Sequence, residues 1–180
     1  TRDEYVKPLQ FITDKPVMYV CNVDENAAVS GNDYVDKVKQ AVKDENAEVI
    51  VLAVGTEADI TELDDYEERQ LFLADIGLDE PGSAKLIRGA YSLLNQQTYF
   101  TAGEKEVRAW TVNIGATAPQ AAGVIHTDFE KGFIRAEVIK YDDFVTYGSE
   151  AKVREAGKLG IEGKTYIVKD GDVMHFLFNV

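Results

Sequence analysis

Two apolar runs without alternation stand out in the first half of the chain. Residues 17–21, in KPVMYVCN, and residues 49–54, in AEVIVLAVG, contain no charged side chain. Such continuous runs are typical of parallel strands that are covered on both faces. Between them, NDYVDKVKQAVKDE at residues 32–45 has apolar side chains at helical spacing after a favoured N-cap residue, Asn32 or Asp33. The pattern predicts a strand–helix–strand unit with a parallel sheet.

Two more helices are predicted before residue 96. Residues 61–78, TELDDYEERQLFLADIGL, begin with acidic side chains, including Asp65, Glu67 and Glu68, which we interpret as a solvated face. Negative charge suits the positive end of a helix dipole. Residues 83–96, SAKLIRGAYSLLNQ, follow a Pro-Gly break and place apolar side chains on one helical face.

From about residue 97 the pattern becomes mixed. Residues 107–115, VRAWTVNIG, and 133–141, FIRAEVIKY, are rich in β-branched and aromatic side chains, as strands are. Alternation in the first of these favours a core position for Trp110. Short helices are expected at residues 118–126 and 141–148. The sequence predicts a small mixed sheet with one or two helices, and a domain boundary near residue 96.

The last residues have the pattern of a β-hairpin. KTYIVKDGDVMHFLFNV, residues 164–180, alternates on both sides of Asp170-Gly171, a favoured hairpin turn pair. We therefore expect two adjacent strands here, with His175 in the second. His126 precedes a polar segment, Thr127-Asp128, and is interpreted as a cap or a contact with a partner.

The charge is strongly acidic and uneven. The net charge is −13, with 19 basic and 32 acidic side chains. Residues 1–96 carry 9 basic and 20 acidic side chains, whereas residues 97–180 carry 10 and 12. Because nucleic acids are bound by neutralising phosphates with Lys and Arg, the first half is a poor nucleic-acid surface, and no DNA partner is expected. No apolar run approaches the length of a membrane span, and no signal peptide is evident at residues 1–10, so no membrane partner is expected.

Common catalytic motifs are missing from the sequence. A P-loop requires GxxxxGK[ST], but the GKT at residues 163–165 has Lys158 where the first glycine belongs and leads into a strand. The two histidines have no metal-ligand spacing, and no GxSxG is present. We assign no catalytic residue and no metal ligand. The single cysteine, Cys21, excludes an internal disulfide and is expected to be a buried, inert thiol in a reducing compartment.

One short segment suggests recognition of a nucleotide base. Asn22 ends the first apolar run, and Glu25 follows three residues later. The carboxyl end of a parallel strand is where α/β sheets bind ligands, and an Asn amide has the donor and acceptor that a purine edge requires. GTPases carry N-[KT]-x-D at this place, whereas Val23 and Glu25 stand here. Spacing alone leaves both a base-reading loop and an ordinary strand end open.

Longer segments resemble the C-terminal half of the YchF subfamily of Obg-like ATPases. These are KPVMYVCNVDEN, EADITELDDYEERQLFL, YFTAGEKEVRAWTV, GATAPQAAGVIHTDFEKGFIRAEVI and YIVKDGDVMHFLFNV. The resemblance implies an α/β plus α+β fold. Residues 1–14 would be the remnant of an inserted helical domain, and residues 15–96 the C-terminal part of a P-loop nucleotide-binding domain with a parallel sheet. Residues 97–180 would be a TGS domain, a ubiquitin-like β-grasp fold.

The resemblance also implies a site. Asn22 would contact adenine, the backbone of Val23 would lie beside the base, and Glu25 would occupy the place of the GTPase Asp. Ala53-Val54-Gly55 would be the second base-side loop, although it departs from the family's Ser-Ala pattern. The full-length protein would bind ATP, and GTP more weakly, with Mg²⁺. Because the P-loop and magnesium ligands of the family are not in these residues, we expect a fragment that does not hydrolyse ATP alone.

The family is associated with ribosomes, which suggests a cytoplasmic protein that contacts the large subunit. Lys131, Phe133 and Arg135 alternate along an expected strand, and we consider them as an RNA-contacting stripe. The alternative is a solvated strand face on which Phe133 shields a neighbouring strand. Interleaved Glu130 and Glu137 favour that alternative. A second hypothesis for the whole chain is a non-enzymatic TGS-type module that binds RNA or protein.

Overall fold

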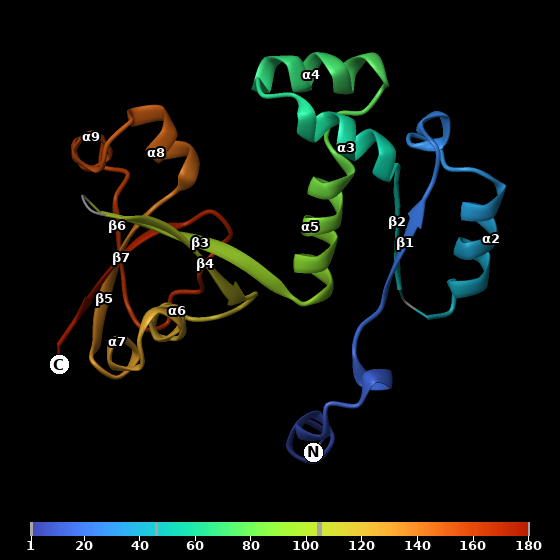
Figure 1. Ribbon diagram of the computed structural model, residues 1–180. Coiled ribbons are helices and arrows are strands. Elements are labelled where there is room, and N and C mark those ends of the chain that lie inside the picture. The colour runs from blue at the N-terminus through green and yellow to red at the C-terminus, as the bar shows by residue number, and fades with distance from the viewer. Residues whose placement is uncertain (1, 46, 104–105, 180) are drawn as a thin grey trace. The chain divides into compact units, whose positions relative to one another are not determined.

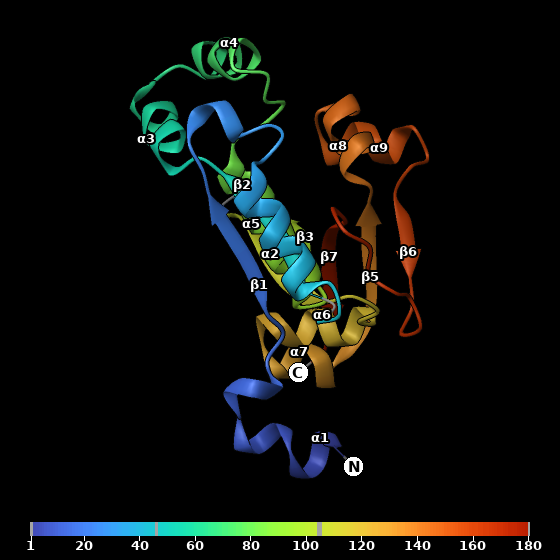
Figure 2. The same cartoon turned by 90° about the vertical axis from the view of Figure 1, so that its right-hand side faces the viewer.

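A computed structural model describes residues 2–45, 47–103 and 106–179 of the chain. It divides into two compact units, Thr1–Leu94 and Asn95–Val180. Figures 1 and 2 show the elements of both, from blue at the N-terminus to red at the C-terminus. Each unit contains both helices and strands.

The first unit contains the expected strand–helix–strand arrangement. Strands β1 (Met18–Asn22) and β2 (Glu48–Leu52) are parallel, in register from Met18 opposite Glu48 to Asn22 opposite Leu52. Between them lie the 3₁₀ turn η3 (Glu25–Ala27) and helix α2 (Asp33–Val42). Asn32 caps α2, because its Oδ1 accepts the backbone N–H groups of Tyr34 and Val35. The predicted helix and its capping residue are confirmed.

The strands are less covered than their apolar sequence predicts. Val17 and Val20 are 47% and 46% exposed, and Cys21 is half-buried where a buried thiol was expected. Within the described residues β1 pairs with β2 alone, so its other edge has no neighbouring strand. The prediction of strands covered on both faces is therefore wrong for β1 in this structure.

Helices follow β2 in a different arrangement from the predicted one. Where one helix was expected over residues 61–78, the structure has two, α3 (Val54–Glu62) and α4 (Tyr66–Asp75). Leu63 is extended after α3. Asp65 then caps α4 by accepting the N–H of Glu67, so the acidic start does belong to a solvated helix N-terminus. Short turns precede the sheet: α1 (Arg2–Tyr5), η1 (Lys7–Leu9) and η2 (Ile12–Asp14).

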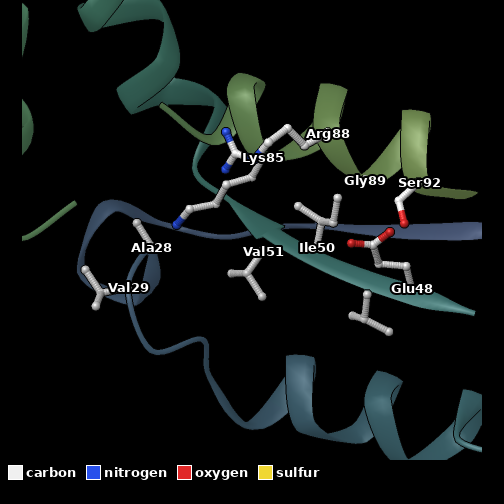
Figure 3. A pocket seen from close by; sticks show the side chains of 10 residues that line it. Ala28, Val29, Glu48, Ile50, Val51, Lys85, Arg88, Gly89 and Ser92 are labelled. Atoms are coloured by element: carbon white, nitrogen blue, oxygen red, sulfur yellow. The ribbon is translucent and has the colours of Figure 1, made fainter. Parts of the chain in front are cut away.

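Helix α5 (Gly82–Leu93) confirms the predicted helix over residues 83–96, apart from its last residues. It packs closely on β2, as Figure 3 shows along much of its length. Gly82 and Gly89 are buried at this contact. A Cβ atom on Gly82 would lie 2.7 Å from the Cβ of Leu52, so the close approach of helix and strand requires glycine there.

The second unit is built on a mixed sheet. In the described residues its strands are β3 (Gln96–Ala102), β4 (Val107–Asn113), β5 (Phe133–Ile139), β6 (Gly160–Glu162) and β7 (Val173–Phe178). Their order is β4-β3-β7-β5-β6, and β3 and β7 are parallel while the other neighbours are antiparallel. The strands expected at residues 107–115 and 133–141 are confirmed.

The predicted hairpin at residues 164–180 is wrong. Asp170-Gly171 does make a turn, with Gly171 at φ 78°, but the segment before it is not a strand paired with β7. That segment instead crosses to other elements: the N–H of Val168 donates to the carbonyl of Ala116, and its carbonyl accepts from Gln97 Nε2. Strand β7 pairs with β3 and β5.

Helices cover both faces of this sheet. The predicted helices appear as α6 (Ala118–Ile125) and α8 (Tyr141–Tyr147), each followed by a short helix, α7 (Thr127–Lys131) and α9 (Glu150–Glu155). Because neighbouring side chains on a strand point to opposite faces, two apolar clusters result. Tyr99, Val138 and Met174 pack with α6. Their neighbours Phe100, Ile139 and Val173 pack with α8 and α9.

A buried carboxylate fastens the chain before β7. Asp172 is fully buried. Its Oδ1 lies 2.5 Å from Lys140 Nζ, and its Oδ2 accepts from the Tyr166 hydroxyl at 2.7 Å and from the N–H of Lys169 at 2.9 Å. Burying a charge costs little only when it is paired and hydrogen-bonded, as this one is. No local pattern in the sequence indicates this network, because Lys140 and Asp172 are 32 residues apart.

Candidate functional site

Asn22 stands at the carboxyl end of β1, where a ligand is expected in a parallel sheet. Its Oδ1 accepts the backbone N–H of Val54 at 3.0 Å, across 32 residues of sequence. The N–H of Val23 donates to the carbonyl of Leu52 at 3.0 Å, which extends the strand pairing by one residue. These bonds join the end of β1 to the start of α3 and fix the orientation of the Asn22 amide. For the Nδ2 group there is no hydrogen bond within the part of the chain that the structure describes.

The segment Ala53-Val54-Gly55 is brought beside Asn22 as expected, but it is not a loop. Ala53 is buried at the N-cap position of α3, and Val54 and Gly55 are the first helical residues. Val54 is 54% exposed, and a Cβ on Gly55 would meet nothing within 4 Å. The first N–H groups of a helix have no partner inside it. Asn22 supplies one for Val54, and this explains why the chain enters the helix here.

Val23, Asp24 and Glu25 have different environments. The Val23 side chain is half-buried against the apolar cluster of Ala53, Ile60 and Leu73. Asp24 caps η3, because its Oδ1 accepts the N–H of Ala27 at 3.1 Å. Glu25 is exposed, and no hydrogen bond to its carboxylate is recorded within the described part of the chain. Asp24 is thus a structural carboxylate that sequence reasoning missed, although an Asp before a short turn is a common cap.

Glu57 links this region to α5. Its two carboxylate oxygens accept the N–H groups of Gly82 at 2.6 Å and Ser83 at 3.0 Å, at the start of α5. A carboxylate is favoured there by the helix dipole. The start of α3 is therefore held by Asn22, and one turn later the same helix holds α5. No pattern in the sequence indicated this contact, since Glu57 and Gly82 are 25 residues apart.

A separate hollow of about 480 Å³ is lined by β2, by α5 and by Ala28 and Val29. Figure 3 shows Lys85 extending from α5 toward Ala28, and Glu48 beside Ser92 at the other end. Arg88, which also lines the hollow, is paired with Glu80. Asn22 and Val54 do not line it. It is thus distinct from the end of β1.

The expected basic and aromatic stripe does not exist as predicted. Phe133 is 3% exposed and belongs to the core with Phe176. Lys131 ends α7 and is not in the strand. A register irregularity between Phe133 and Arg135 breaks the alternation of β5, so Ile134 and Arg135 are both exposed. Phe133 therefore cannot stack on a base, and the alternative of a shielding aromatic is correct for this residue.

The remaining sequence candidates are structural or exposed. His126 caps α7, because its Nδ1 accepts the N–H of Asp128 at 3.2 Å, which confirms one of its two predicted roles. His175 is exposed in β7. Trp110 is half-buried against the core rather than enclosed by it, and its Nε1 donates to Thr101 Oγ1 at 2.9 Å. Over the described ranges no three His, Cys, Asp or Glu side chains gather as metal ligands.

Where the chain is described, no helix is both long and apolar enough to cross a bilayer.

Comparison with known proteins gives consistent results. A family profile named YchF-GTPase_C and described as a protein of unknown function (DUF933) matches residues 96–179. The chain is 58% identical over 175 residues to the "Ribosome-binding ATPase YchF" of Escherichia coli O157:H7. The aligned residues make up 97% of this chain and 48% of that protein. It is 52% identical over 181 residues to the protein of the same name from Bacillus subtilis, covering 99% and 49%. The chain thus spans about half the length of the curated relatives it matches.

Solved structures agree with this assignment. The YchF GTPase of Schizosaccharomyces pombe matches 97% of this chain and 46% of that chain, with a TM-score of 0.80 and 37% sequence identity. A GTP binding protein from Pyrococcus horikoshii OT3 matches 92% of this chain with a TM-score of 0.61 and 15% identity, which supports the fold alone. The mixed α/β fold predicted from the sequence is confirmed. The chain belongs to the YchF family.

Proposed function

We propose that this chain is the C-terminal half of a ribosome-binding ATPase, and that the end of β1 with the start of α3 reads the purine base of ATP. Residues 15–96 would complete a P-loop nucleotide-binding domain, after a remnant of a helical domain at residues 1–14. Residues 97–180 would be a TGS domain. The names of the relatives and the match to a YchF GTPase support the class of activity.

The observation that carries the proposal is the bond between Asn22 Oδ1 and the Val54 N–H. An Asn amide has one acceptor group and two donor hydrogens. With Oδ1 facing the helix, the Nδ2 group is the one available to a ligand, and purine N7 is an acceptor. Both adenine and guanine carry N7, so Asn22 favours purines without choosing between them. The exposed start of α3 at Val54 and Gly55 would lie against the same base.

Glu25 would influence the choice between ATP and GTP. In GTPases an Asp at this place accepts from guanine N1–H and the 2-amino group, which adenine lacks. A carboxylate held at that edge would lose its partners with adenine, at a cost of about 1–3 kcal/mol. Because the longer Glu25 side chain is exposed and no hydrogen bond holds it within the described residues, it can turn to solvent when adenine is bound. The penalty against adenine is thereby relieved, and the expected preference for ATP over GTP rests on the similarity to the YchF relatives.

The phosphates and Mg²⁺ would be held elsewhere. Hydrolysis requires positioned phosphates and a metal ion that stabilises the developing charge. We assign these parts to the half of the relatives that this chain does not match. The residues shown here supply no P-loop, and their role at the nucleotide is to bind and orient the base. ATP and Mg²⁺ would act in the full-length protein, with hydrolysis as a conformational switch on the ribosome in the cytoplasm.

Nucleotide binding by the full-length protein tests this function. Glu25→Asp should raise the affinity for GTP relative to ATP, because the shorter carboxylate restores the guanine partner. Val23 is a poor second change, since it packs against the apolar cluster of α3 and α4. Isothermal titration calorimetry with both nucleotides measures the ratio. An unchanged ratio would reject the role of Glu25, and ATPase activity in the 180-residue chain alone would reject the assignment of hydrolysis to the other half.

A non-enzymatic binding module is the second candidate function. It is favoured by one observation: the second unit has helices on both faces of its sheet and its own apolar clusters. In this alternative the ribosome contact belongs to the second unit, with Lys131 and Arg135 as exposed cations. Lys131→Glu with Arg135→Glu in the full-length protein should then reduce co-sedimentation with the large ribosomal subunit. Unchanged co-sedimentation would remove these two residues from the interface.

A further inference from the structure

A hollow of about 480 Å³ lies within the second unit, between one face of its sheet and the α8–α9 segment. Apolar side chains form most of its wall, including Ala102, Ile139 and Val173 from three strands and Phe144 and Leu159 from the opposite side. Phe144 and Leu159 are only partly buried although they belong to the second apolar cluster. The hollow is in the size range of sites that take a ligand or the side chains of a bound peptide.

The rim of this hollow is acidic. Glu137 on β5 and Glu150 on α9 both line it, and both pair with the same atom, Arg154 Nη2, at 2.9 and 3.1 Å. Glu137 Oε2 and Glu150 Oε1 make these bonds. For the other oxygen of each carboxylate no hydrogen bond is recorded in the described residues. His175 also lines the hollow, directly opposite Glu137 across the β5–β7 pair.

We propose that this hollow binds a peptide segment of a partner protein in which an apolar side chain is flanked by Lys or Arg. The apolar side chain would fill the space between Ile139 and Phe144. The ammonium or guanidinium groups would donate to the carboxylate oxygens of Glu137 and Glu150 that Arg154 leaves unused. Two carboxylates and one guanidinium leave a net negative rim, which complements a cationic segment.

The charge of the rim decides between classes of macromolecule. A nucleic acid would place phosphates beside Glu137 and Glu150, and binding phosphates requires cations in excess. The chain as a whole carries 32 acidic and 19 basic side chains, which adds to the repulsion. A basic peptide gains from both the apolar wall and the acidic rim. This site is separate from Asn22 and does not rest on the proposed nucleotide function.

The test is a titration of the ¹⁵N-labelled 180-residue chain with an acetylated and amidated peptide, Lys-Lys-Leu-Phe-Lys-Lys. Amide shifts should change at Gly103, Gly148 and His175, which line the hollow. A second peptide with Ser-Ser in place of Leu-Phe should bind at least about tenfold more weakly, because it has no apolar side chain to bury. Equal binding of the two peptides, or shifts confined to other surfaces, would overturn the proposal.

Matched variants on α9 test the rim. Glu150→Gln removes one carboxylate of the hollow and should weaken the Leu-Phe peptide about fivefold. Glu155→Gln makes the same change of charge on the same helix, but Glu155 does not line the hollow. The Glu155→Gln variant should therefore bind the Leu-Phe peptide as tightly as the parent chain does. An equal loss of peptide affinity in both variants would show that only the net charge of the chain matters, and would contradict binding in the hollow. Shifts at the same amides caused by raising the chain concentration, or by an RNA homopolymer, would instead show a second copy or RNA as the occupant.

Discussion

The two units differ in how completely they cover their sheets. In the second unit, β5 and β7 have a strand on each side, and apolar clusters lie on both faces. In the first unit, β1 and β2 have only each other in the described residues, and Val17 and Val20 are about half exposed. Parallel strands are normally buried on both faces. The second unit thus closes a core of its own, whereas the strands of the first unit are more exposed.

The units also differ in charge. The residues up to 96 carry a net charge of −11 (9 − 20), and those from 97 carry −2 (10 − 12). The proposed base-reading segment therefore lies in the more acidic half. An amide such as Asn22 can recognise a neutral base edge in such surroundings, but phosphates need neutralising cations. This contrast supports the assignment of the phosphates to the other half of the full-length protein.

The largest expected effect is on the second unit, where Asp172 is fully buried. Asp172→Ala should destabilise this unit by about 3 kcal/mol, because Lys140, Tyr166 and the Lys169 N–H all lose their shared acceptor. Trp110 is the single tryptophan and lies in this unit, so its fluorescence during urea unfolding measures the change. Asp142→Ala, at the exposed first turn of α8, is the control and should change stability by less than about 0.5 kcal/mol. Equal effects of both would contradict the role of the buried network.

The second largest expected effect on stability is in the first unit, at the contact of α5 with β2. Gly82→Ala should destabilise this unit by about 1–3 kcal/mol, because the new Cβ would lie 2.7 Å from the Leu52 Cβ and 3.0 Å from Glu57 Oε1. Gly55→Ala adds the same atom in open space on α3 and should be neutral or stabilising by up to about 1 kcal/mol. Hydrogen exchange of the α5 amides, followed by mass spectrometry, distinguishes them. Slower exchange in Gly82→Ala than in the parent would refute the close packing.

A smaller expected effect is a dependence of the second unit's stability on pH. Burial lowers the pKa of Lys140, but its hydrogen bonds to Asp172 and Tyr166 and the attraction of the Asp172 charge outweigh this, so the pKa lies above the ordinary value of 10.5. A raised pKa gives stability that is fully present below the ordinary value and is lost as the pH rises through the folded one. Burial and the bond to Asp172 also raise the pKa of Tyr166. Tyr166 therefore also contributes stability that is lost as the pH rises.

The urea midpoint of Trp110 fluorescence should therefore stay level from pH 8 to about pH 10 and fall above it. Lys140→Met should lower the midpoint at pH 8 and reduce the further fall at pH 11. A midpoint in Lys140→Met that falls as steeply as in the parent chain would assign the alkaline loss to other groups. The first unit contains neither residue, and hydrogen exchange of its amides, followed by mass spectrometry, provides an internal comparison.

Local patterns predicted much of the fold. The two apolar runs, the helix capped by Asn32 and the helix α5 are set by neighbours in sequence, and they appear as expected. The helix over residues 61–78 was divided because Asp65 makes a better cap than a mid-helix residue. The hairpin failed for a different reason. Asp170-Gly171 is a true turn, but the partners of β7 lie far away in the sequence, and no local pattern encodes them.

The sequence indicated which segments lie beside each other, but not the contacts between them. Asn22 and Val54 are brought together, yet the bond between them depends on the register of β1 and β2. Glu57 was missed because its partners begin a helix 25 residues later. Phe133 was misplaced because one irregular residue in β5 reverses the faces that follow, an event that alternation in the sequence does not reveal.

Two substitutions at Asn22 test the central claim most directly. Asn22→Asp keeps an oxygen for the Val54 N–H but replaces the Nδ2 donor with a second acceptor, whereas Asn22→Ala removes both groups. ATP affinity of the full-length protein, measured by calorimetry, should fall about tenfold or more in both variants. The stability of the first unit should fall by about 1 kcal/mol in the alanine variant alone. If Asn22→Asp binds ATP as tightly as the parent protein, Asn22 fastens α3 and does not read the base.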